Sequence, residues 1–418
     1  MSSMAGGARW KLALTLMVTL LVGYYDRLNV SLALPLIAED FGWTPSETRH
    51  YGSLLMSLFY IGYGLGNIVL SPLGARLGLK RSLIVIILLW SFFTALGAWA
   101  SSMLMMFIAT RLMLGLSEGI HFPLMSQLTK NWFPPQERSR GNGTWIAGLF
   151  LSFLTAPLFL VPLMDSHGWR GGFYTLAVIG LFISLPLVIR FVHDRPADHP
   201  RIDANERAWI EEATAREERQ LYTDPHSLRV ALRAPVFVLL VCVGILNNII
   251  ALGIAGWLPT YLAGREGVNY QQLIWLTALP YAFSVIGIVL WANLGDRTDH
   301  RSAIAGLSYL LAGGVIWLAL SAQGVWATVA LFSAAVFLVA AWSAAEFALV
   351  QRVLPQPHVA AGSGVYNGLA TMIGGGSGPF VVGGIIDGGT SFQAIAPIIT
   401  ITTLNAALLW TVYRRLRY

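Results

Sequence analysis

Two adjacent charged residues, Asp26 and Arg27, lie inside an apolar segment that covers about residues 10–36. A helix of about 20 apolar residues crosses the hydrocarbon core of a bilayer, and a charge at its centre costs about 2.5–3.5 kcal/mol. Both charges are therefore expected to face protein or an aqueous cavity rather than lipid. Charges in such positions bind substrates, carry protons or pair with a neighbouring helix.

The helical period assigns these two charges to different faces. Tyr24, Arg27 and Ser31 follow an i, i+3, i+7 pattern and share one face, whereas Asp26 points about 100° away. A guanidinium group suits bidentate recognition of a carboxylate, so we expect Arg27, with Tyr24 beside it, to bind an anionic ligand. Asp26 is expected to contact a neighbouring helix. The alternative is an ion pair that only locks two helices together.

A second set of charges, Arg111 and Glu118, lies in the apolar segment of residues 104–128. Their spacing places them on one stripe, about 10 Å apart along the helix axis, so they do not bond to each other directly. Counting depth from the ends of the segments predicts an ion pair between Asp26 and Arg111, with Glu118 deeper and free to titrate. Burial favours the protonated form of a carboxyl, which a proton carrier requires. The alternative is a permanently paired, structural Glu118.

The composition is that of a membrane protein with many spans. The chain has 418 residues, of which 56% are hydrophobic and 11% are charged, whereas ordinary soluble domains have about 25% charged residues. Its single cysteine, Cys242, excludes an intramolecular disulfide, and the sequence has no metal-ligand cluster and no P-loop. We therefore expect no metal, no cofactor and no direct use of ATP. The net charge of +6 follows the membrane topology and does not indicate a nucleic-acid partner.

Twelve apolar segments are long enough to cross a bilayer, which predicts an all-α membrane protein. The segments cover about residues 10–36, 50–72, 82–100, 104–128, 140–163, 170–192, 236–262, 270–294, 303–321, 325–350, 359–385 and 392–413. The N-terminal segment begins like a signal peptide but lacks a clean cleavage site, so we interpret it as a retained first span.

Basic residues indicate on which side of the membrane the termini lie. They gather near both termini and in alternate loops, with eight arginines from Arg190 to Arg233. The opposite loops hold only Arg49, Arg170 and Arg265. By the positive-inside rule we expect both termini in the cytoplasm, in a bacterial cytoplasmic (inner) membrane.

The longest hydrophilic stretch, residues 193–235, separates the sixth segment from the seventh. Asp203 and Glu206 have the spacing of a capping box, and Arg207–Glu211 and Glu212–Arg216 are i, i+4 pairs. These features predict a short charged helix at the cytoplasmic surface, without chemistry of its own.

The sequence on either side of this stretch repeats a loop motif. Leu73–Lys80 follows the second segment, and Leu294–Arg301 follows the eighth, which is the equivalent position. Matched halves, 1–192 and 236–418 joined by 193–235, resemble the major facilitator superfamily. The resemblance implies twelve transmembrane helices in two six-helix halves.

Further motifs narrow the resemblance to the anion:cation symporter family. They are spread over nearly the whole chain: Phe59–Gly64 with Arg76 and Gly78, Arg111–Gly115 with Glu118 and Phe122–Pro123, Trp132–Pro134 with Glu137–Arg138, Trp257–Pro259 with Tyr261–Leu262, and Tyr366–Asn367.

The family resemblance has implications for the residues that couple transport to protons and for the residues that bind the substrate. It implies proton coupling through Asp26 and Glu118, and we count Arg111, the predicted partner of Asp26, in the same proton-coupling group. It also places Tyr63 and Asn367 at the substrate, with Tyr366 next to Asn367. From the residues alone, polar groups at these depths either bond to another helix or line the cavity.

The loop motifs are the conformational elements of this family. The resemblance assigns that role to Arg76 and Gly78 in the first loop and to Asp296 and Arg297 in the second. Ala75 occupies the acidic position of the first motif, a departure that weakens the expected latch in the N-terminal half.

Glu346 is the acid within the membrane that the family resemblance does not explain. It shares a helical face with Ser343, and counting depth places it near Asn367, so all three are expected to bind substrate. An ionised carboxylate there would repel an anion. Either Glu346 is protonated, as a second proton site, or the substrate presents a donor or cationic group to it. The alternative is an interfacial acid that pairs with Arg352.

These observations predict a secondary active transporter that moves an organic anion, a carboxylate, with one or more protons by alternating access. An anion exchanger is the alternative within the same class. Gly115–Gly119 matches the hydrolase motif G-x-S-x-G but lies inside an apolar span, where glycines four residues apart suit close helix packing. We therefore expect no enzyme, and we expect a monomer.

Overall fold

The computed structural model describes residues 7–134, 137–221, 228–298, 300–354, 359–387 and 392–417, and these ranges contain helices and no strand. The helices, with the short π-helical and 3₁₀ turns labelled η, are α1 (Ala8–Phe41), α2 (Pro45–Leu65), η1 (Gly66–Leu70), α3 (Ser71–Leu77), α4 (Leu79–Trp99), η2 (Ala100–Ser102), α5 (Leu104–Glu118), α6 (His121–Trp132), α7 (Arg138–Ile179), η3 (Gly180–Ser184), α8 (Leu185–Phe191), η4 (Pro196–Asp198), α9 (Ala204–Leu221), α10 (Leu228–Arg233), α11 (Pro235–Ala263), η5 (Tyr270–Gln272), α12 (Leu273–Thr298), α13 (Arg301–Ser321), α14 (Val325–Val353), α15 (Val359–Leu369), η7 (Ala370–Gly375), α16 (Gly376–Asp387) and α17 (Phe392–Leu416).

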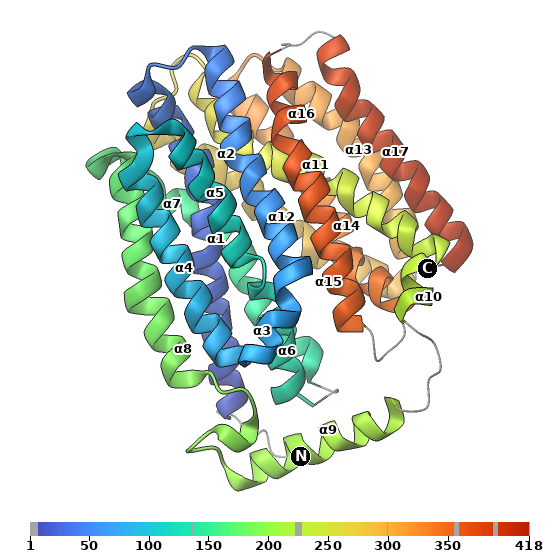
Figure 1. Cartoon of the computed structure of the whole chain (residues 1–418). Coiled ribbons are helices and arrows are strands. Elements are labelled where there is room, and N and C mark those ends of the chain that lie inside the picture. The colour runs from blue at the N-terminus through green and yellow to red at the C-terminus, as the bar shows by residue number, and fades with distance from the viewer. Residues whose placement is uncertain are drawn as a thin grey trace.

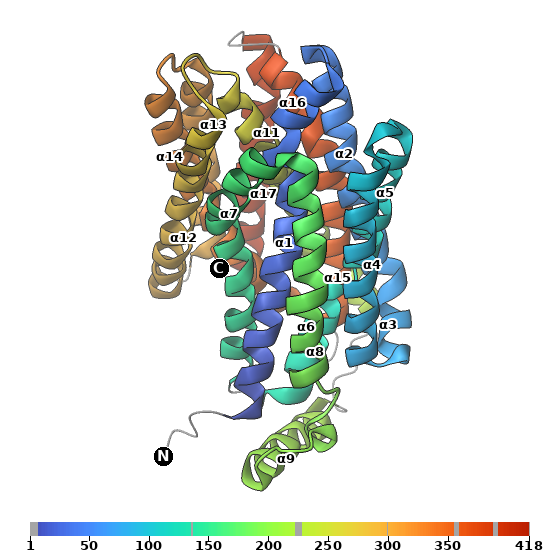
Figure 2. The ribbon, with the colours of Figure 1, turned by 90° about the vertical axis from the view of Figure 1, so that its left-hand side faces the viewer.

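The predicted twelve spans are confirmed. Within the described residues, nine helical stretches are long and apolar enough to cross a membrane. One of them, Arg140–Phe191, has 52 residues and turns back at Gly168, whose φ of 68° favours glycine. It therefore supplies two crossings, the second descending beside α1 (Figure 2). The helix α1 and the α5–α6 stretch, which hold the buried charges, complete the set.

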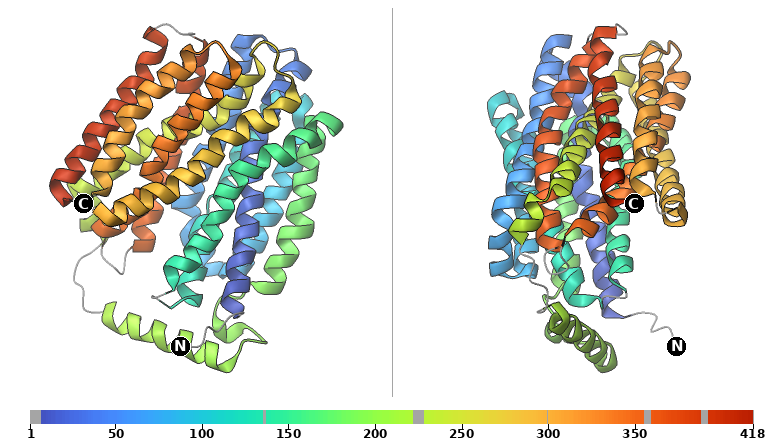
Figure 3. Two further views of the ribbon diagram at one scale, coloured as in Figure 1. Left: turned by 180° about the vertical axis from the view of Figure 1, so that it is seen from behind. Right: turned by 90° about the vertical axis from the view of Figure 1, so that its right-hand side faces the viewer.

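The helices form two halves that stand side by side. Helices α1–α8 make up one half and α11–α17 the other, as the colours from blue to green and from yellow to red show (Figures 1 and 3). The two-half fold is as predicted. The proposed boundaries at residues 192 and 236 stay a prediction, although α8 ends at Phe191 and α11 begins at Pro235.

The helix predicted in the hydrophilic stretch is α9, which lies across the end of the bundle where α1 begins (Figures 1 and 2). Asp203 Oδ1 accepts hydrogen bonds from the backbone N–H groups of Asn205 (2.9 Å) and Glu206 (3.1 Å), so Asp203 caps the helix. The Glu206 side chain does not complete a capping box, because its carboxylate bonds to α1. The predicted i, i+4 pairs also form: Arg207–Glu211 at 2.8 Å and Arg216–Glu212 at 2.5 Å.

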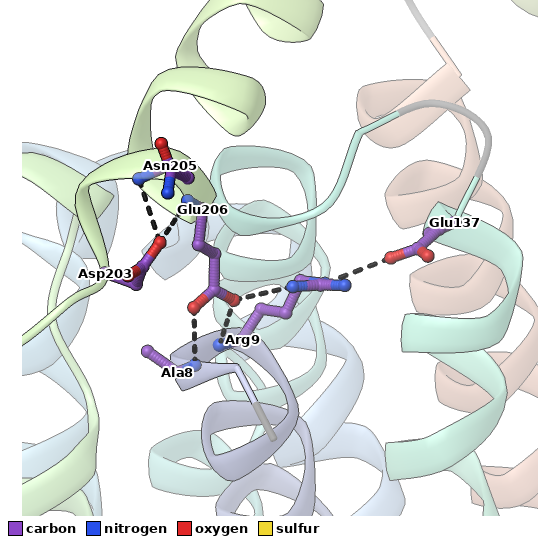
Figure 4. Close-up of polar contacts among 6 residues, drawn as sticks. All are labelled: Ala8, Arg9, Glu137, Asp203, Asn205 and Glu206. Atoms are coloured by element: carbon purple, nitrogen blue, oxygen red, sulfur yellow. Dashed lines mark hydrogen bonds and ion pairs between the residues drawn. The ribbon is translucent and has the colours of Figure 1, made fainter. Parts of the chain in front are cut away.

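A buried ion pair fastens α9 to α1. Glu206 accepts hydrogen bonds from the backbone N–H of Ala8 (2.9 Å) and from Arg9 Nη1 (2.7 Å), and Arg9 Nε bonds to Glu137 at 3.0 Å. Figure 4 shows the Arg9 guanidinium between these two carboxylates. Arg9 and Glu206 are only 3% and 4% exposed. Arg9 therefore holds the linker helix to the N-terminal half.

Glycines allow α2 and α5 to pack in close contact. A Cβ on Gly115 would lie 2.0 Å from the backbone oxygen of Phe59, and one on Gly119 would lie 2.3 Å from that of Tyr63. From the other side, a Cβ on Gly62 would lie 2.2 Å from the backbone oxygen of Leu112. The predicted packing role of the Gly115–Gly119 pair is confirmed.

Hydrogen bonds join the two halves at the end of the bundle remote from α9. Tyr270 donates to the backbone oxygen of Leu32 at 3.0 Å, and Gln271 donates to Asp165 at 2.9 Å. Ser53 on α2 donates to the backbone oxygen of Pro379 on α16 at 3.0 Å. These contacts hold the halves together on that side.

Candidate substrate and proton site

A cavity of about 450 Å³ lies between the two halves, with walls from both. A larger hollow, of about 1430 Å³, lies between α8 and the linker helix α9, away from the Asp26–Arg27 pair. We place the candidate site in the smaller cavity because its wall holds Arg27. Its polar lining residues are Tyr24, Arg27, Tyr60 and Tyr63 from the N-terminal half, and Asn247, Asn248, Tyr281, Ser284, Ser343, Glu346, Asn367 and Thr371 from the C-terminal half.

Arg27 forms an ion pair with Glu118 at the wall of this cavity. Arg27 Nε donates to Glu118 Oε2 at 2.9 Å, and the two side chains are 6% and 0% exposed. The guanidinium carbon lies 4.1 Å from the centroid of the Tyr24 ring and 4.2 Å from that of Tyr63. Two aromatic rings and a carboxylate therefore hold the planar group in place.

Asp26 points away from the cavity, as the helical period predicts. Its Oδ1 accepts hydrogen bonds from Thr94 Oγ1 on α4 (2.9 Å) and from Asn29 Nδ2 (3.2 Å). Its Oδ2 is buried and has no hydrogen-bond partner among the described residues. Asp26 is therefore a fully buried carboxyl that is not fully satisfied.

The expected Asp26–Arg111 ion pair is wrong, and so is the expected free Glu118. Glu118 pairs with Arg27, while Arg111 makes no ion pair among the described residues. Arg111 Nε and Nη1 lack hydrogen-bond partners there, and its guanidinium lies 5.1 Å from the Phe59 ring. The depth of each charged residue along its helix was estimated well enough to predict that the four charges lie close together. Depth does not determine how each helix is rotated about its own axis. Arg111 still interacts electrostatically with Asp26 and Glu118.

On the opposite wall, Glu346 lines the cavity, and Tyr366 lies behind it. Tyr366 is fully buried and donates its hydroxyl to Glu346 Oε1 at 2.7 Å. The prediction that Tyr366 contacts substrate directly is therefore corrected to a supporting contact, because only one of the adjacent residues Tyr366 and Asn367 faces the cavity. The alternative prediction was an ion pair between Glu346 and Arg352. The ion pairs between described residues do not include it.

The other residues predicted to bind substrate also line the cavity, and substrate binding by them stays a prediction. Tyr24 and Tyr63 lie on the N-terminal wall, and Ser343 and Asn367 on the C-terminal wall. The structure thus brings residues from α1, α2, α14 and α15 to one cavity.

Sequence reasoning missed an amide pair on α11. Asn247 and Asn248 line the cavity, Asn247 Nδ2 donates to Asn248 Oδ1 at 3.0 Å, and Tyr309 donates to Asn247 Oδ1 at 2.5 Å. Two adjacent amides inside an apolar span were the available signal, since buried polar groups need partners.

The loop motifs are described only in part. Gly78 has a φ of 94° and separates α3 from α4, and the Asp194 carboxylate accepts the backbone N–H groups of Leu79 (3.1 Å) and Lys80 (2.7 Å) at the start of α4. Arg76 and Arg297 are exposed. The side chain of Asp296 lies outside the described residues.

The hydrolase motif has no catalytic geometry in the structure. Ser117 donates its hydroxyl to the backbone oxygen of Leu114 at 2.7 Å, inside α5. A strand–turn–helix elbow is not formed there, because Gly115–Glu118 lie in α5 and Gly119 is the C-cap of that helix. No group of potential metal ligands occurs within the part of the chain that the structure describes.

Comparison with known protein families agrees with this architecture. A profile of the Major Facilitator Superfamily matches residues 16–379, and a second match covers residues 267–418. The chain belongs to the Major Facilitator Superfamily. Its relatives within the superfamily carry the names of transporters.

Two bacterial relatives and one plant relative illustrate the range. The chain is 30% identical over 302 residues to the probable sulfoacetate transporter SauU of Cupriavidus necator, covering 72% of this chain and 67% of that protein. It is 25% identical over 379 residues to the hexuronate transporter of Bacillus subtilis, covering 88% and 85%. With the probable anion transporter 3, chloroplastic, of Oryza sativa subsp. japonica it shares 28% identity over 288 residues. That match covers 67% of this chain but 54% of the plant protein, so the chain spans about half the length of this relative.

Two solved structures of transporters share the fold. A bacterial homologue of the human lysosomal transporter Spinster, inward-facing and unoccupied, superposes with a TM-score of 0.78 at 17% identity, covering 99% of this chain and 98% of that one. A D-xylose–proton symporter gives a TM-score of 0.70 at 16% identity, with 97% of each chain covered. The predicted resemblance to anion transporters is confirmed, and the protein is a transporter rather than an enzyme.

Proposed function

We propose that this transporter carries an organic anion together with one or more protons, by secondary active symport. The observation that supports the proposal most is the buried ion pair of Arg27 and Glu118 at the cavity wall. Arg27 offers the planar fork that suits a carboxylate, and Glu118 offers a carboxyl that can hold a proton. Relatives named for sulfoacetate and hexuronate agree with an anionic substrate.

The ion pair suggests how the two ligands depend on each other. A proton on Glu118 removes the negative partner of Arg27 and frees the guanidinium for the substrate carboxylate. Conversely, a carboxylate bound to Arg27 leaves Glu118 without its counterion, which favours a proton there. The two effects are equal in free energy, so proton and anion load and leave together.

The remaining members of the site have supporting roles in this proposal. Asp26 and Arg111 form the second part of the proton-coupling group, because both are buried and each has an atom without a hydrogen-bond partner among the described residues. The substrate contacts Tyr24 and Tyr63 on one wall. On the other wall it contacts Asn367, Ser343 and Glu346.

Transport proceeds by alternating access between the halves. The hydrogen bonds remote from α9, among them Tyr270–Leu32 and Ser53–Pro379, would break when the cavity opens to that side. We assign the loop motifs at Arg76–Gly78 and Asp296–Arg297 to this movement. The side with α9 and both termini is cytoplasmic by its basic loops, the membrane is a bacterial inner membrane, and the working unit is a monomer.

Uptake into proteoliposomes tests the function. Purified protein would be reconstituted, the voltage clamped with potassium and valinomycin, and uptake of radiolabelled D-glucuronate, sulfoacetate and other organic acids measured. We expect uptake of at least one acid to accelerate as the external pH falls. Uptake that ignores the pH gradient but requires an anion inside the vesicles would make the protein an exchanger.

A further inference from the structure

Glu346 is an acid in the wall of the cavity, and the described residues give it no cationic partner. Among the described lining residues, Arg27 and Glu346 carry charge, and they come from opposite halves of the molecule. Glu346 forms no ion pair with a Lys, Arg or His of the described residues. A carboxylate in such a place needs hydrogen-bond donors or a positive charge from elsewhere.

The protein supplies Glu346 with one donor and holds it in position. Tyr366 donates to Oε1 at 2.7 Å from behind the cavity wall. Tyr366 is itself fixed by close packing, since a Cβ on Gly244 of α11 would lie 2.5 Å from its hydroxyl. Glu346 Oε2 accepts no hydrogen bond within the described part of the chain and is not among the buried unpaired atoms. This oxygen is the one available to the cavity.

We propose that Glu346, supported by Tyr366, is a specificity subsite that accepts a hydrogen-bond donor at the end of the substrate remote from its carboxylate. The proposal rests on the proposed function, in which Arg27 binds that carboxylate. The donor is a hydroxyl or an ammonium group, both of which can donate to a carboxylate. A second carboxylate or a sulfonate at that end would face Glu346 with like charge and be rejected.

The subsite therefore selects monoanions with a neutral or cationic far end over dianions. The two bacterial relatives differ in this respect: a hexuronate has hydroxyl groups away from its carboxylate, whereas sulfoacetate has an anionic group at each end. For this chain, Glu346 favours a substrate of the first kind. Ser343, which lies one helical turn from Glu346 and also lines the cavity, adds a hydroxyl to the same wall.

The test uses acids that differ only at the remote end. One series is D-gluconate, 6-amino-6-deoxy-D-gluconate and D-glucarate, which carry a hydroxyl, an ammonium and a carboxylate there. A shorter series is 3-hydroxypropanoate, β-alanine and malonate. Binding to purified protein would be measured by calorimetry for wild type, Glu346→Gln and the control Glu266→Gln, which makes the same charge change at an exposed position of the same half.

We expect wild type and Glu266→Gln to bind the hydroxy or amino acid of one series at least about tenfold more tightly than the dicarboxylate. Glu346→Gln should reverse this order and bind the dicarboxylate at least about tenfold more tightly. The substitution weakens binding of the amino acid and strengthens binding of the dicarboxylate. If Glu346→Gln loses more affinity for the amino acid than for the hydroxy acid, the donor is an ammonium. Similar losses of affinity for the two acids identify a hydroxyl as the donor. Tyr366→Phe should decrease the ratio of the two affinities without abolishing the preference. This second variant tests the subsite even if Glu346→Gln is poorly folded.

Equal binding of the dicarboxylate and the hydroxy acid by wild type, or an unchanged order in Glu346→Gln, would overturn the subsite. So would a preference for an acid without a remote donor, such as benzoate, and in that case the proposed anion transport would stand. If no organic acid bound to wild type, the proposed function itself would fail.

Discussion

The Arg27 guanidinium and the Glu118 carboxylate meet at 2.9 Å across α1 and α5, and both side chains are almost fully buried. An ion pair of this kind is costly to break by removing one partner, because the other charge is left buried. When a substrate anion and a proton arrive together, the anion takes the place of Glu118 as the partner of Arg27, and the proton neutralises Glu118. The pair therefore provides a reason for symport that neither residue provides alone.

The first prediction concerns Glu118. Glu118→Gln keeps the shape of the side chain but cannot release a proton, so concentrative uptake driven by a pH gradient should be lost while counterflow exchange remains measurable. Both would be measured in proteoliposomes, with Glu39→Gln, an exposed position on α1, as control. Accumulation of substrate against its gradient by Glu118→Gln would remove Glu118 from coupling.

Arg27 is expected to determine affinity. Arg27→Lys keeps the charge but loses the planar fork between the Tyr24 and Tyr63 rings, so substrate affinity should fall about 10- to 100-fold. Expression and elution on size exclusion should not change. Calorimetric titration with the transported acid measures the effect, and equal affinities for the variant and wild type would exclude Arg27 from the site.

Asp26 is expected to act on the transport cycle rather than on binding. Asp26→Asn can still accept the Thr94 hydrogen bond, but it removes a negative charge that interacts with Arg111. Substrate affinity should stay within about threefold of wild type, while the exchange rate falls by at least about tenfold. Thr94→Val, which removes the hydrogen bond but keeps the charge, should have the smaller effect on rate. A loss of affinity without a loss of rate would contradict this role.

The linker helix offers a stability test with an internal control. Glu206→Ala leaves Arg9 buried without its main partner and should destabilise the protein by about 3–5 kcal/mol. Glu211→Ala removes the exposed partner of Arg207 and should cost about 0–1 kcal/mol. Thermal melting in detergent would show a large decrease in Tm for Glu206→Ala and a small one for Glu211→Ala. Equal decreases would mean that α9 is not fastened by this pair.

Much of the fold followed from local patterns. Apolar segment lengths predicted the twelve spans, because the bilayer thickness fixes the length of a span. The cap at Asp203 and the packing of Gly115 depend on residues close in sequence or on the absence of a side chain, so they too were predicted.

The pairing of the buried charges was not predictable in the same way. Periodicity fixes which residues of one helix share a face, and it correctly separated Arg27 from Asp26. It does not fix how α1 and α5 are rotated relative to each other, and that rotation pairs Glu118 with Arg27. The same limit applies to Tyr366 and Asn367, because a motif match names both residues but only Asn367 faces the cavity.

In the proposed transport cycle, protons move with the anion through the Arg27–Glu118 pair. The most direct measurement is the internal pH of proteoliposomes loaded with a pH-sensitive dye, with no imposed pH gradient, after addition of the acid that is taken up best. Acidification of the lumen in step with uptake is expected for wild type, and none is expected for Glu118→Gln. Uptake by wild type without a change in lumenal pH, or acidification that persists in Glu118→Gln, would contradict it.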